Sequence, residues 1–368
     1  MASVKRRGNA WQATYRGPDG RERTKTFRLR VEADHWVTDQ VAMMNRGEWL
    51  DPRAGRTTFG EYAKRWQAIQ VHRPSTAAGV AANLRLHMLP TFETRSLGSI
   101  LPSDLQAWVR DRSEVLRPSS LRIVYKQLVA VLRAAAADRL ITSVPTNGVR
   151  LPRIEPAKID PLPTEVVDRL IDAVPERYRA LVVLAAGTGL RQGECLGLTV
   201  DRVNFLRRQL TVDRQLIIPP GSGTPILGPP KTESSYRTVP LPQVVTDALA
   251  SHLATFPPGP DAFVFTTPKG DPISRGRFSE MWRPATARAG APVGTGFHAL
   301  RHFYASLLIR HGENVKTVQA RLGHKTAAET LNTYSHLWPD SEDRTRTAID
   351  DVLGVTRTAR GHDAAVES

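Results

Sequence analysis

Two residues near the C-terminal end of the chain have the types and spacing to bind an anion. His298 and Arg301 are three positions apart, so on a helix both side chains project from the same side. An arginine guanidinium offers paired donors that match phosphate oxygens, and a neighbouring imidazole can donate to the same group or accept a proton from an attacking hydroxyl. A phosphodiester is the anion that this pair fits best.

A second arginine stands in the stretch Thr-Gly-Leu-Arg-Gln-Gly-Glu at residues 188–194. The glycines let the backbone turn into a new helix, which would present Arg191 near its start. Arg191 and Arg301 could then clamp one phosphate from both sides. Glu194, one helical turn after Arg191, is expected to orient a guanidinium or an adjacent histidine rather than to react.

Five motifs follow one another in the second half of the chain: Arg191, Lys231, His-x-x-Arg at 298–301, Leu-Gly-His ending at His324, and Tyr334. Together and in this order they resemble the active-site set of the tyrosine recombinase (phage integrase) family. The resemblance covers about residues 160–350. It implies a site-specific DNA recombinase that needs no metal, ATP or other cofactor and integrates or excises a mobile element such as a viral genome.

Cutting and resealing DNA without a high-energy cofactor requires that the bond energy be kept in a covalent enzyme intermediate. By the resemblance, the phenol of Tyr334 attacks the scissile phosphate and gives a 3′-phosphotyrosine and a free 5′-hydroxyl. Arg191 and Arg301 would hold the non-bridging oxygens before reaction. His298 is the candidate base for the Tyr334 proton, and His324 the candidate donor to the phosphate.

The leaving 5′-oxygen needs a proton, which a lysine on a mobile hairpin can supply more readily than an arginine. Lys231 is favoured for this role by its context, Lys-Thr-x-x-x-x-Arg-Thr-Val-Pro-Leu-Pro. Lys269, in the possible turn Pro-Lys-Gly-Asp at 268–271, is the alternative.

The other histidines are not expected to take part in catalysis. His298 and His302 have the i, i+4 spacing of a zinc-binding helix, but Arg301 lies between them and would repel a dication, so a metal site is disfavoured. His302, His311 and His336 are interpreted as non-catalytic, because most histidines are surface or core residues.

The composition points to a polyanionic partner. The chain has 368 residues, room for two or three domains, and a net charge of +15. Residues 1–56 carry 12 Lys and Arg against 7 Asp and Glu, and residues 57–157 carry 14 against 7, whereas residues 158–368 carry 25 against 22. The basic excess therefore marks the N-terminal parts as candidate DNA-binding domains.

The sequence indicates a protein of a reducing compartment. Cys195 is the only cysteine, so no internal disulfide can form. The N-terminus lacks the apolar segment of a signal peptide, and the longest apolar run, residues 180–186, is too short to span a bilayer. The expected location is the cytoplasm of a bacterial host cell, in association with the nucleoid and not with a membrane.

The first domain is expected to be a small sheet backed by a helix. Residues 10–16 alternate apolar and polar side chains, the sequence Gly-Pro-Asp-Gly at 17–20 predicts a turn, a second strand follows at 21–29, and helical spacing covers 31–46. In integrases that this chain resembles, such a module binds arm-type DNA sites. Five basic residues are expected on its open face: Arg16, Arg21, Arg23, Lys25 and Arg28.

A linker rich in helix breakers at 50–58 leads to four predicted helices, at 59–71, 75–88, 102–114 and 118–140. This all-α segment resembles the core-binding domain of the family. Its candidate phosphate contacts are Arg73, Arg85, Arg117, Arg122 and Lys126. A proline-rich segment at 145–163 should stay extended and let two domains close around a duplex.

The catalytic domain is expected to be mainly helical. Helices are predicted at 164–174, 176–186, 244–255, 274–289, 297–311, 315–322, 326–336 and 340–353, with a helix after Arg191 and strands at 209–217 and 236–241. The chain is thus predicted to be multidomain, mainly α with small β-sheets. Its expected parts are an arm-binding domain at 1–55, a core-binding domain at 56–150, a linker at 151–163, a mixed α+β catalytic domain at 164–354 and a disordered tail at 355–368.

The resemblance further implies a homotetramer on double-stranded DNA with core and arm sites, and possible partners are an excisionase and a DNA-bending host factor. Two other functions stay open on the sequence alone. One is a type IB topoisomerase-like enzyme, which uses similar chemistry, and the other is a catalytically inactive DNA-binding regulator of the same fold. A metal-dependent nuclease is a third alternative, and it predicts that chelator abolishes cutting.

Overall fold

The computed structural model divides the chain into two compact units, Met1–Glu155 and Pro156–Ser368. Both are mainly helical with small antiparallel sheets, as the sequence predicts. No helix among the described residues is long and apolar enough to cross a bilayer. The residues that the structure describes are 2–46, 49, 51, 54–155, 158–219, 221–259, 261–338, 346–347 and 349–351.

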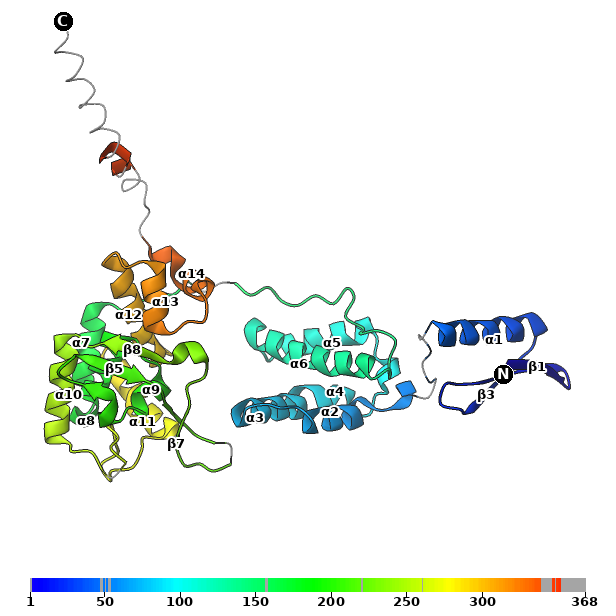
Figure 1. The fold of residues 1–368 in the computed structure, drawn as a ribbon, viewed down its shortest axis with the longest axis horizontal. Coiled ribbons are helices and arrows are strands. Elements are labelled where there is room, and N and C mark those ends of the chain that lie inside the picture. The colour runs from blue at the N-terminus through cyan, green and yellow to red at the C-terminus, as the bar shows by residue number, and fades with distance from the viewer. Residues whose placement is uncertain are drawn as a thin grey trace, which may run out of the picture. The chain divides into compact units, whose positions relative to one another are not determined.

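The first unit begins with a three-stranded antiparallel sheet covered by one helix (Figure 1). The Gly-Pro-Asp-Gly turn joins the second and third strands, and its Gly17 nitrogen donates to the Arg21 carbonyl oxygen at 2.9 Å. The first strand is absent from the sequence prediction, because three of its six residues are basic and it shows no apolar alternation. The elements are β1 (Ala2–Arg7), β2 (Ala10–Arg16), β3 (Glu22–Phe27) and α1 (Arg30–Asn45).

The strand register corrects the predicted DNA face of this sheet. Tyr15 pairs with Arg23, and Ala13 pairs with Lys25, so each pair shares one face. Tyr15 and Ala13 are buried, and the ring of Trp36 on α1 packs edge-on against Tyr15 at 5.2 Å between centroids. The expectation that Arg23 and Lys25 lie on the open face is wrong, because they occupy alternate positions on the face that α1 covers.

Arg23 and Lys25 both have structural partners on the face that α1 covers. Arg23 Nη2 lies 2.8 Å from carboxylate oxygens of both Asp19 and Asp51, and its guanidinium lies over the Trp49 ring. Lys25 Nζ lies 5.1 Å from the centroid of the Phe27 ring. We therefore do not assign Arg23 and Lys25 to DNA binding.

The open face of the sheet carries other basic residues. The register pairs Lys5 with Gln12 and Arg7 with Ala10, which places both cations on the face opposite Tyr15. Thr14 and Thr24 share this face, where their hydroxyls lie 3.3 Å apart. Arg16 also projects from it, at the end of β2. Arg21 and Arg28 are exposed beside the ends of β3.

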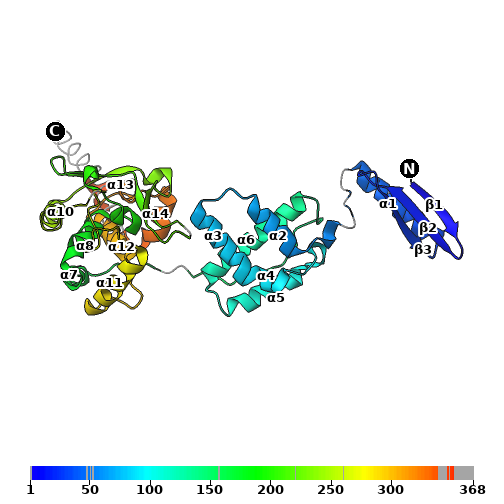
Figure 2. The ribbon, with the colours of Figure 1, turned by 90° about the horizontal axis from the view of Figure 1, so that it is seen from below.

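The rest of the first unit is a helical bundle (Figure 2). Its core contains Phe59, Met88, Phe92, Trp108 and Leu128, all buried. Thr58 and Glu61 form a capping box at the start of the first helix. The helices are α2 (Phe59–Ala68), α3 (Pro74–Asn83), α4 (Leu89–Phe92), α5 (Pro102–Ser113) and α6 (Pro118–Ala137).

One predicted helix of this bundle is irregular. The segment predicted at 75–88 ends as an α-helix at Asn83 and continues as a π-helical turn, Leu84–Met88. Pro90 lies two residues after this turn, and proline neither donates a backbone hydrogen bond nor tolerates the carbonyl four residues before it. The wider turn accommodates that proline. The five candidate phosphate contacts of the bundle are exposed side chains: Arg73, Arg85, Arg117, Arg122 and Lys126.

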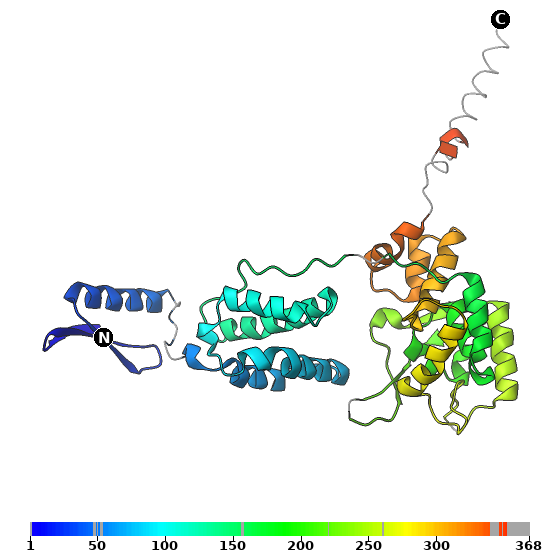
Figure 3. The ribbon, with the colours of Figure 1, turned by 180° about the vertical axis from the view of Figure 1, so that it is seen from behind.

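The second unit is a group of helices with a few short strands (Figure 3), and several of its helices pack against α8. Its apolar core includes Leu181 and Leu184 of α8, Val239 of the sheet and Leu300. Cys195 is fully buried in this core. The helices are α7 (Thr164–Ala173), α8 (Glu176–Thr188), α9 (Gln192–Leu196), α10 (Gln243–Thr255), α11 (Arg275–Arg288), α12 (His298–Arg310), α13 (Val315–Leu322) and α14 (Ala327–Tyr334).

The strands of the second unit form two small antiparallel sheets. The strand predicted at 209–217 is interrupted at Asp213 and Arg214, where the Asp213 carboxylate accepts from Arg202 Nε at 2.7 Å and from Arg214 Nε at 2.8 Å. The two pieces therefore join different sheets. One sheet has the order β4-β5-β8, from Val203–Asn204, Gln209–Val212 and Arg237–Pro240, and the other pairs β6 (Gln215–Ile217) with β7 (Ile226–Gly228).

The helix predicted at 326–336 ends as an α-helix at Tyr334 and continues as a 3₁₀ turn, Ser335–Leu337. Most of the helix predicted at 340–353, and all of the tail at 355–368, lie outside the described residues.

Candidate active site

Arg191 is positioned by the end of one helix and the start of the next. Gly189 ends α8 in the left-handed region with φ +64°, and a Cβ there would overlap the Tyr304 ring, so this turn requires glycine. Arg191 then precedes α9, where its backbone nitrogen donates to Glu194 Oε2 and its Nη1 donates to Oε1, each at 2.9 Å. Glu194 thus orients this guanidinium.

Glu194 also binds a second arginine, Arg237, which the sequence interpretation did not single out. Arg237 Nη2 donates to Glu194 Oε2 at 2.9 Å, and both side chains are buried. Burial raises the pKa of Glu194, but the bonds from Arg237 and the charges of Arg237 and Arg191 outweigh that effect and leave the pKa below its ordinary value. Glu194 is therefore a carboxylate shared between two cations.

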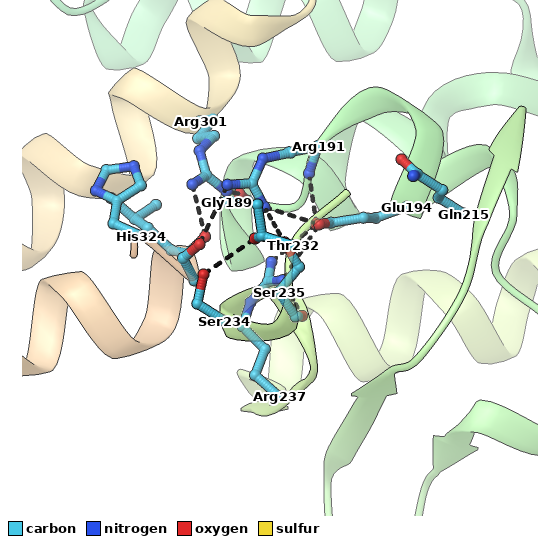
Figure 4. A network of polar contacts seen from close by, with 12 residues as sticks. Gly189, Arg191, Glu194, Gln215, Thr232, Ser234, Ser235, Arg237, Arg301 and His324 are labelled. Carbon is cyan, nitrogen blue, oxygen red and sulfur yellow. Dashed lines mark hydrogen bonds and ion pairs between the residues drawn. The ribbon is translucent and has the colours of Figure 1, made fainter. Parts of the chain in front are cut away.

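Arg301 lies beside Arg191 (Figure 4). Only 1% of Arg301 is exposed, and it donates from Nη1 to the Gly189 carbonyl oxygen at 2.7 Å and from Nη2 to the Leu322 carbonyl oxygen at 2.6 Å. Arg191 Nη2 donates to the next carbonyl, that of Gly323, at 3.2 Å. Burial, followed by the charge of Arg191, lowers the pKa of Arg301 to about 9. Two guanidiniums predicted to share one phosphate are thus brought together.

His324 follows these two carbonyls directly. Its Nδ1 lies 2.9 Å from Thr330 Oγ1, and its ring stacks on Tyr334 with an interplanar angle of 11° and centroids 6.4 Å apart. Burial, then the charge of Arg301, lowers the pKa of His324 to about 4. The ring is therefore neutral at pH 7.

Tyr334 is held inside the unit by His302. The phenol is 1% exposed, and its oxygen lies 2.8 Å from His302 Nδ1. Burial raises the pKa of Tyr334 to about 12, although Arg301 acts in the opposite direction. Burial, together with the charges of His298 and Arg301, lowers the pKa of His302 to about 4. A protonated phenol thus meets a neutral imidazole at pH 7.

This contact places His302 at the phenol, and the interpretation of this residue as non-catalytic stays a prediction. His298, the expected base, lies beside His302 with ring centroids 4.7 Å apart and perpendicular planes, and it is His302 that contacts the phenol. Burial, then the charges of Arg301 and Arg191, lowers the pKa of His298 to about 4. The i, i+4 spacing of the two histidines was the available signal, since it places both rings on one face of α12.

Lys231 is exposed in the turn between β7 and β8. This turn reaches the site, because Ser235 Oγ accepts from Arg191 Nη1 at 3.3 Å. Lys269 lies in a different hairpin, where Thr266 accepts from Arg177 in the first turn of α8. Arg301 contacts the opposite end of that helix, and 13 helical residues span about 20 Å. The geometry therefore favours Lys231 over Lys269.

The other two histidines interpreted as non-catalytic, His311 and His336, make no hydrogen bond to the phenol within the described residues. His311 is exposed just after α12, and His336 Nε2 lies 2.8 Å from the carbonyl oxygen of Ile159. Within the described residues, no group of three or more His, Cys, Asp or Glu side chains could hold a metal ion.

A hollow of about 820 Å³ opens beside His298. It lies between α11 and the loop before α12, and Gln192, next to Arg191, forms part of its wall. Arg275 and Arg283 add two cations to the lining. This hollow gives an anionic ligand a basic approach to the site.

Known proteins are similar to this chain in sequence. Residues 161–340 match the model of the phage integrase family. A putative prophage phiRv2 integrase from Mycobacterium tuberculosis is 30% identical over 343 residues, which cover 89% of this chain and 88% of that protein. The integrase of Mycobacterium phage D29 is 26% identical over 339 residues, covering 86% and 87%.

Solved structures share the fold. The Tn1549 transposon integrase, in complex with a circular intermediate DNA, matches with a TM-score of 0.69 and 23% identity over 80% of this chain and 99% of that one. A lambda integrase tetramer bound to a Holliday junction matches with a TM-score of 0.59 and 18% identity over 89% and 96%.

Proposed function

This chain belongs to the phage integrase family of tyrosine recombinases, and from that premise we propose that it is a site-specific integrase whose nucleophile is Tyr334. The observation that carries the assignment of the site is the pair of guanidiniums, Arg191 and Arg301, bound to the adjacent carbonyls of Gly323 and Leu322. The residue after Gly323 is His324, whose ring stacks on the Tyr334 phenol.

The reaction forms one bond and breaks one bond at the same phosphorus. The Tyr334 phenol gives its proton to His298, the candidate base, and its oxygen bonds to the scissile phosphorus as the bond to the 5′-oxygen breaks, while Lys231 gives the departing oxygen a proton. A later attack by a 5′-hydroxyl reverses these steps and releases the phenol. The energy of the phosphodiester is kept throughout, so the cycle is balanced without a cofactor.

The clamp has donors to spare for the phosphate. A guanidinium has five N–H groups, and the bonds to Gly189 and Leu322 occupy two of those of Arg301. The remaining donors can meet non-bridging oxygens in a buried site, where preformed donors stabilise charge most strongly. His324 adds a further donor if its Nε2 carries the proton.

The nucleophile must be released before it can react. With 1% of its surface exposed, Tyr334 cannot meet a DNA phosphate while it remains bonded to His302. We propose that DNA binding moves the end of α14 and frees the phenol. In the tautomer with hydrogen on Nε2, His302 Nδ1 accepts from the phenol and so holds the nucleophile within its own subunit.

The first unit supplies the remaining DNA contacts. The open face of the β1-β2-β3 sheet presents Lys5, Arg7 and Arg16, and a flat basic sheet fits a major groove. We assign this face to arm-type sites, and the exposed cations of the helical bundle to phosphates at the core site. A homotetramer on two duplexes, an excisionase, a DNA-bending host factor and a cytoplasmic, nucleoid-associated location complete the proposal.

The test uses a nicked duplex that carries the junction between the mobile element and the host DNA. Incubated with chelator, the full chain is expected to form a covalent adduct visible in a denaturing gel, and Tyr334→Phe is expected to form none. Binding without an adduct would support the regulator. Relaxation of plasmids without site preference would support the topoisomerase, and cutting that chelator abolishes would support the metal-dependent nuclease.

A further inference from the structure

Arg237 is not among the predicted catalytic residues, yet it connects three segments of the site. Its Nε donates to the Arg321 carbonyl oxygen at 2.9 Å, at the end of α13, and its Nη1 donates to the Ser235 carbonyl oxygen at 2.9 Å, in the Lys231 turn. Its third partner is the Glu194 carboxylate on α9. Only 6% of its side chain is exposed, so this arginine faces inward (Figure 4).

The Arg237 side chain also explains the glycine of the Leu-Gly-His motif. Gly323 ends α13 with φ +64°, and a Cβ there would lie 2.9 Å from the Ser234 carbonyl oxygen and 3.2 Å from Arg237 Cδ. The Lys231 turn therefore packs directly on the backbone whose next residue is His324. Arg237 lies at the point where the two segments meet.

The charges give Arg237 a second effect. Glu194 Oε1 accepts from Arg191 at 2.9 Å and from Arg237 at 3.3 Å, so one buried carboxylate is divided between two guanidiniums. Without Arg237, the Glu194 carboxylate would be paired with Arg191 alone. It would then compete with the phosphate for the Arg191 guanidinium. A buried carboxylate left with half its partners is costly and reorganises around the partner that remains.

We propose that Arg237 is a positioning residue for DNA cleavage, which neutralises Glu194 and so leaves Arg191 free to bind the scissile phosphate, while it fixes the Lys231 turn against the Leu-Gly-His turn. The proposal rests on the function assigned above. The Arg237 guanidinium binds Arg321, Ser235 and Glu194, and it acts on cleavage through Arg191.

The test compares Arg237→Lys with the unmodified full chain in single-turnover cleavage of the nicked junction duplex. Lysine keeps the charge but cannot reach Arg321, Ser235 and Glu194 together. Cleavage is expected to fall about 10- to 100-fold, with duplex affinity within about threefold, in the range found for lost positioning of a catalytic donor. Arg202→Lys is the matched control, since Arg202 is paired with Asp213 outside the site, and it is expected to cleave normally.

Two further measurements separate positioning from a general loss of structure. If Arg237 acts through Arg191, the double variant with Arg237→Lys and Arg191→Lys should cleave much faster than the product of the two single effects predicts. A junction duplex with a neutral methylphosphonate at the scissile position has less charge to clamp, so the gap between Arg237→Lys and the unmodified chain should shrink. Multiplied effects, or an unchanged gap, would overturn the proposal.

Folding is monitored by thermal denaturation of each variant. Should Arg237→Lys melt below the assay temperature, Arg237→Gln, which can still donate to Ser235, is measured in the same way and is expected to show the same dependence on phosphate charge. Normal cleavage by a folded Arg237 variant would refute the inference. Failure of the unmodified chain to form a Tyr334 adduct would instead refute the proposed function.

Discussion

Tyr334 meets two imidazoles of different kinds, one that bonds its hydroxyl and one that stacks on its ring. Neutral rings suit both positions, because a charged imidazole beside Arg301 would add to the cationic repulsion. Burial supplies that neutrality by lowering the pKa of His302 and His324 to about 4. The site therefore combines two guanidiniums that can bind a phosphate with two neutral imidazoles that contact the nucleophile.

The clamp predicts a separation of binding from cleavage. Arg191→Lys and Arg301→Lys keep the positive charge but lose the fork that spans two phosphate oxygens. Each should reduce single-turnover cleavage by about 100-fold or more and change duplex affinity little. Gel-shift and adduct assays on the same duplex measure the two quantities. A parallel loss of affinity would show that these arginines are general DNA contacts.

The His302 contact predicts different effects from two substitutions. His302→Asn keeps an acceptor near the position of Nδ1, whereas His302→Phe removes it. The phenol must leave His302 before it reacts, and loss of one hydrogen bond corresponds to about tenfold, so His302→Phe should form the Tyr334 adduct up to about tenfold faster and His302→Asn at a nearly normal rate. Equal rates for all three proteins would show that this hydrogen bond does not restrain the nucleophile, and slower cleavage by His302→Phe would show that His302 assists the reaction instead.

Three histidines of the site with lowered pKa values predict acid sensitivity. His298, His302 and His324 have pKa values of about 4 in the folded chain against an ordinary value of 6.5. Between these values the unfolded chain binds more protons, so stability rises with pH and is lost as pH falls from about 6.5 to 4. Melting temperatures measured across this window should fall toward pH 4. His302→Asn should weaken that dependence, and an unchanged profile would contradict the assignment.

Among the elements, the α13–α14 turn packs closely on the Lys231 turn. Gly323 has a left-handed backbone, and its Cα faces the Ser234 carbonyl. Gly323→Ala should therefore strain the backbone and push the two turns apart, lowering stability by about 1–3 kcal/mol and slowing cleavage. Denaturant unfolding and adduct formation measure these effects. Gly148→Ala, another positive-φ glycine but with open space at its Cβ, tests the backbone strain alone.

The sheet predicts which cations bind DNA. Replacing Lys5, Arg7 and Arg16 by alanine should weaken arm-site binding and reduce the slope of log affinity against log salt by about 0.9 for each phosphate that the protein no longer neutralises. Arg30→Gln, on the α1 side near Trp11, is the control and should change neither quantity. Titrations at several salt concentrations provide the measurement. A larger effect from Arg23→Gln than from the triple change would restore the covered face as the DNA face.

At the scale of the whole molecule, cleavage and arm-site binding depend on different parts of the chain. The predicted catalytic residues all lie in the second unit, and the apolar core of the helical bundle contains no described residue before Phe59. Deleting residues 1–56 should therefore spare cleavage of the junction duplex and abolish arm-site binding. Both activities are measured on separate duplexes. Loss of cleavage in a folded truncated protein would show that the sheet domain contributes to the active site.

The amino-acid sequence by itself determined the family, the helical fold class and the positions of most helices. These features depend on local patterns: proline and hydroxyl residues at helix starts, glycine at ends, and apolar residues at helical spacing. The order of Arg191, His298, Arg301, His324 and Tyr334 could be interpreted without coordinates, because the residue types themselves define the chemistry. The predicted roles of these residues remain to be tested.

Tertiary structure alone decided the partners of these residues. His302 meets Tyr334 across 32 positions and Arg237 meets Glu194 across 43, and no local pattern encodes such contacts. Strand register decided that Arg23 and Lys25 face α1, because successive residues of a strand point to opposite faces and these two pair with the buried Tyr15 and Ala13. Contacts between distant residues arise only when the whole core packs, so they set which of several suitable side chains reach the phenol, the carboxylate and the DNA.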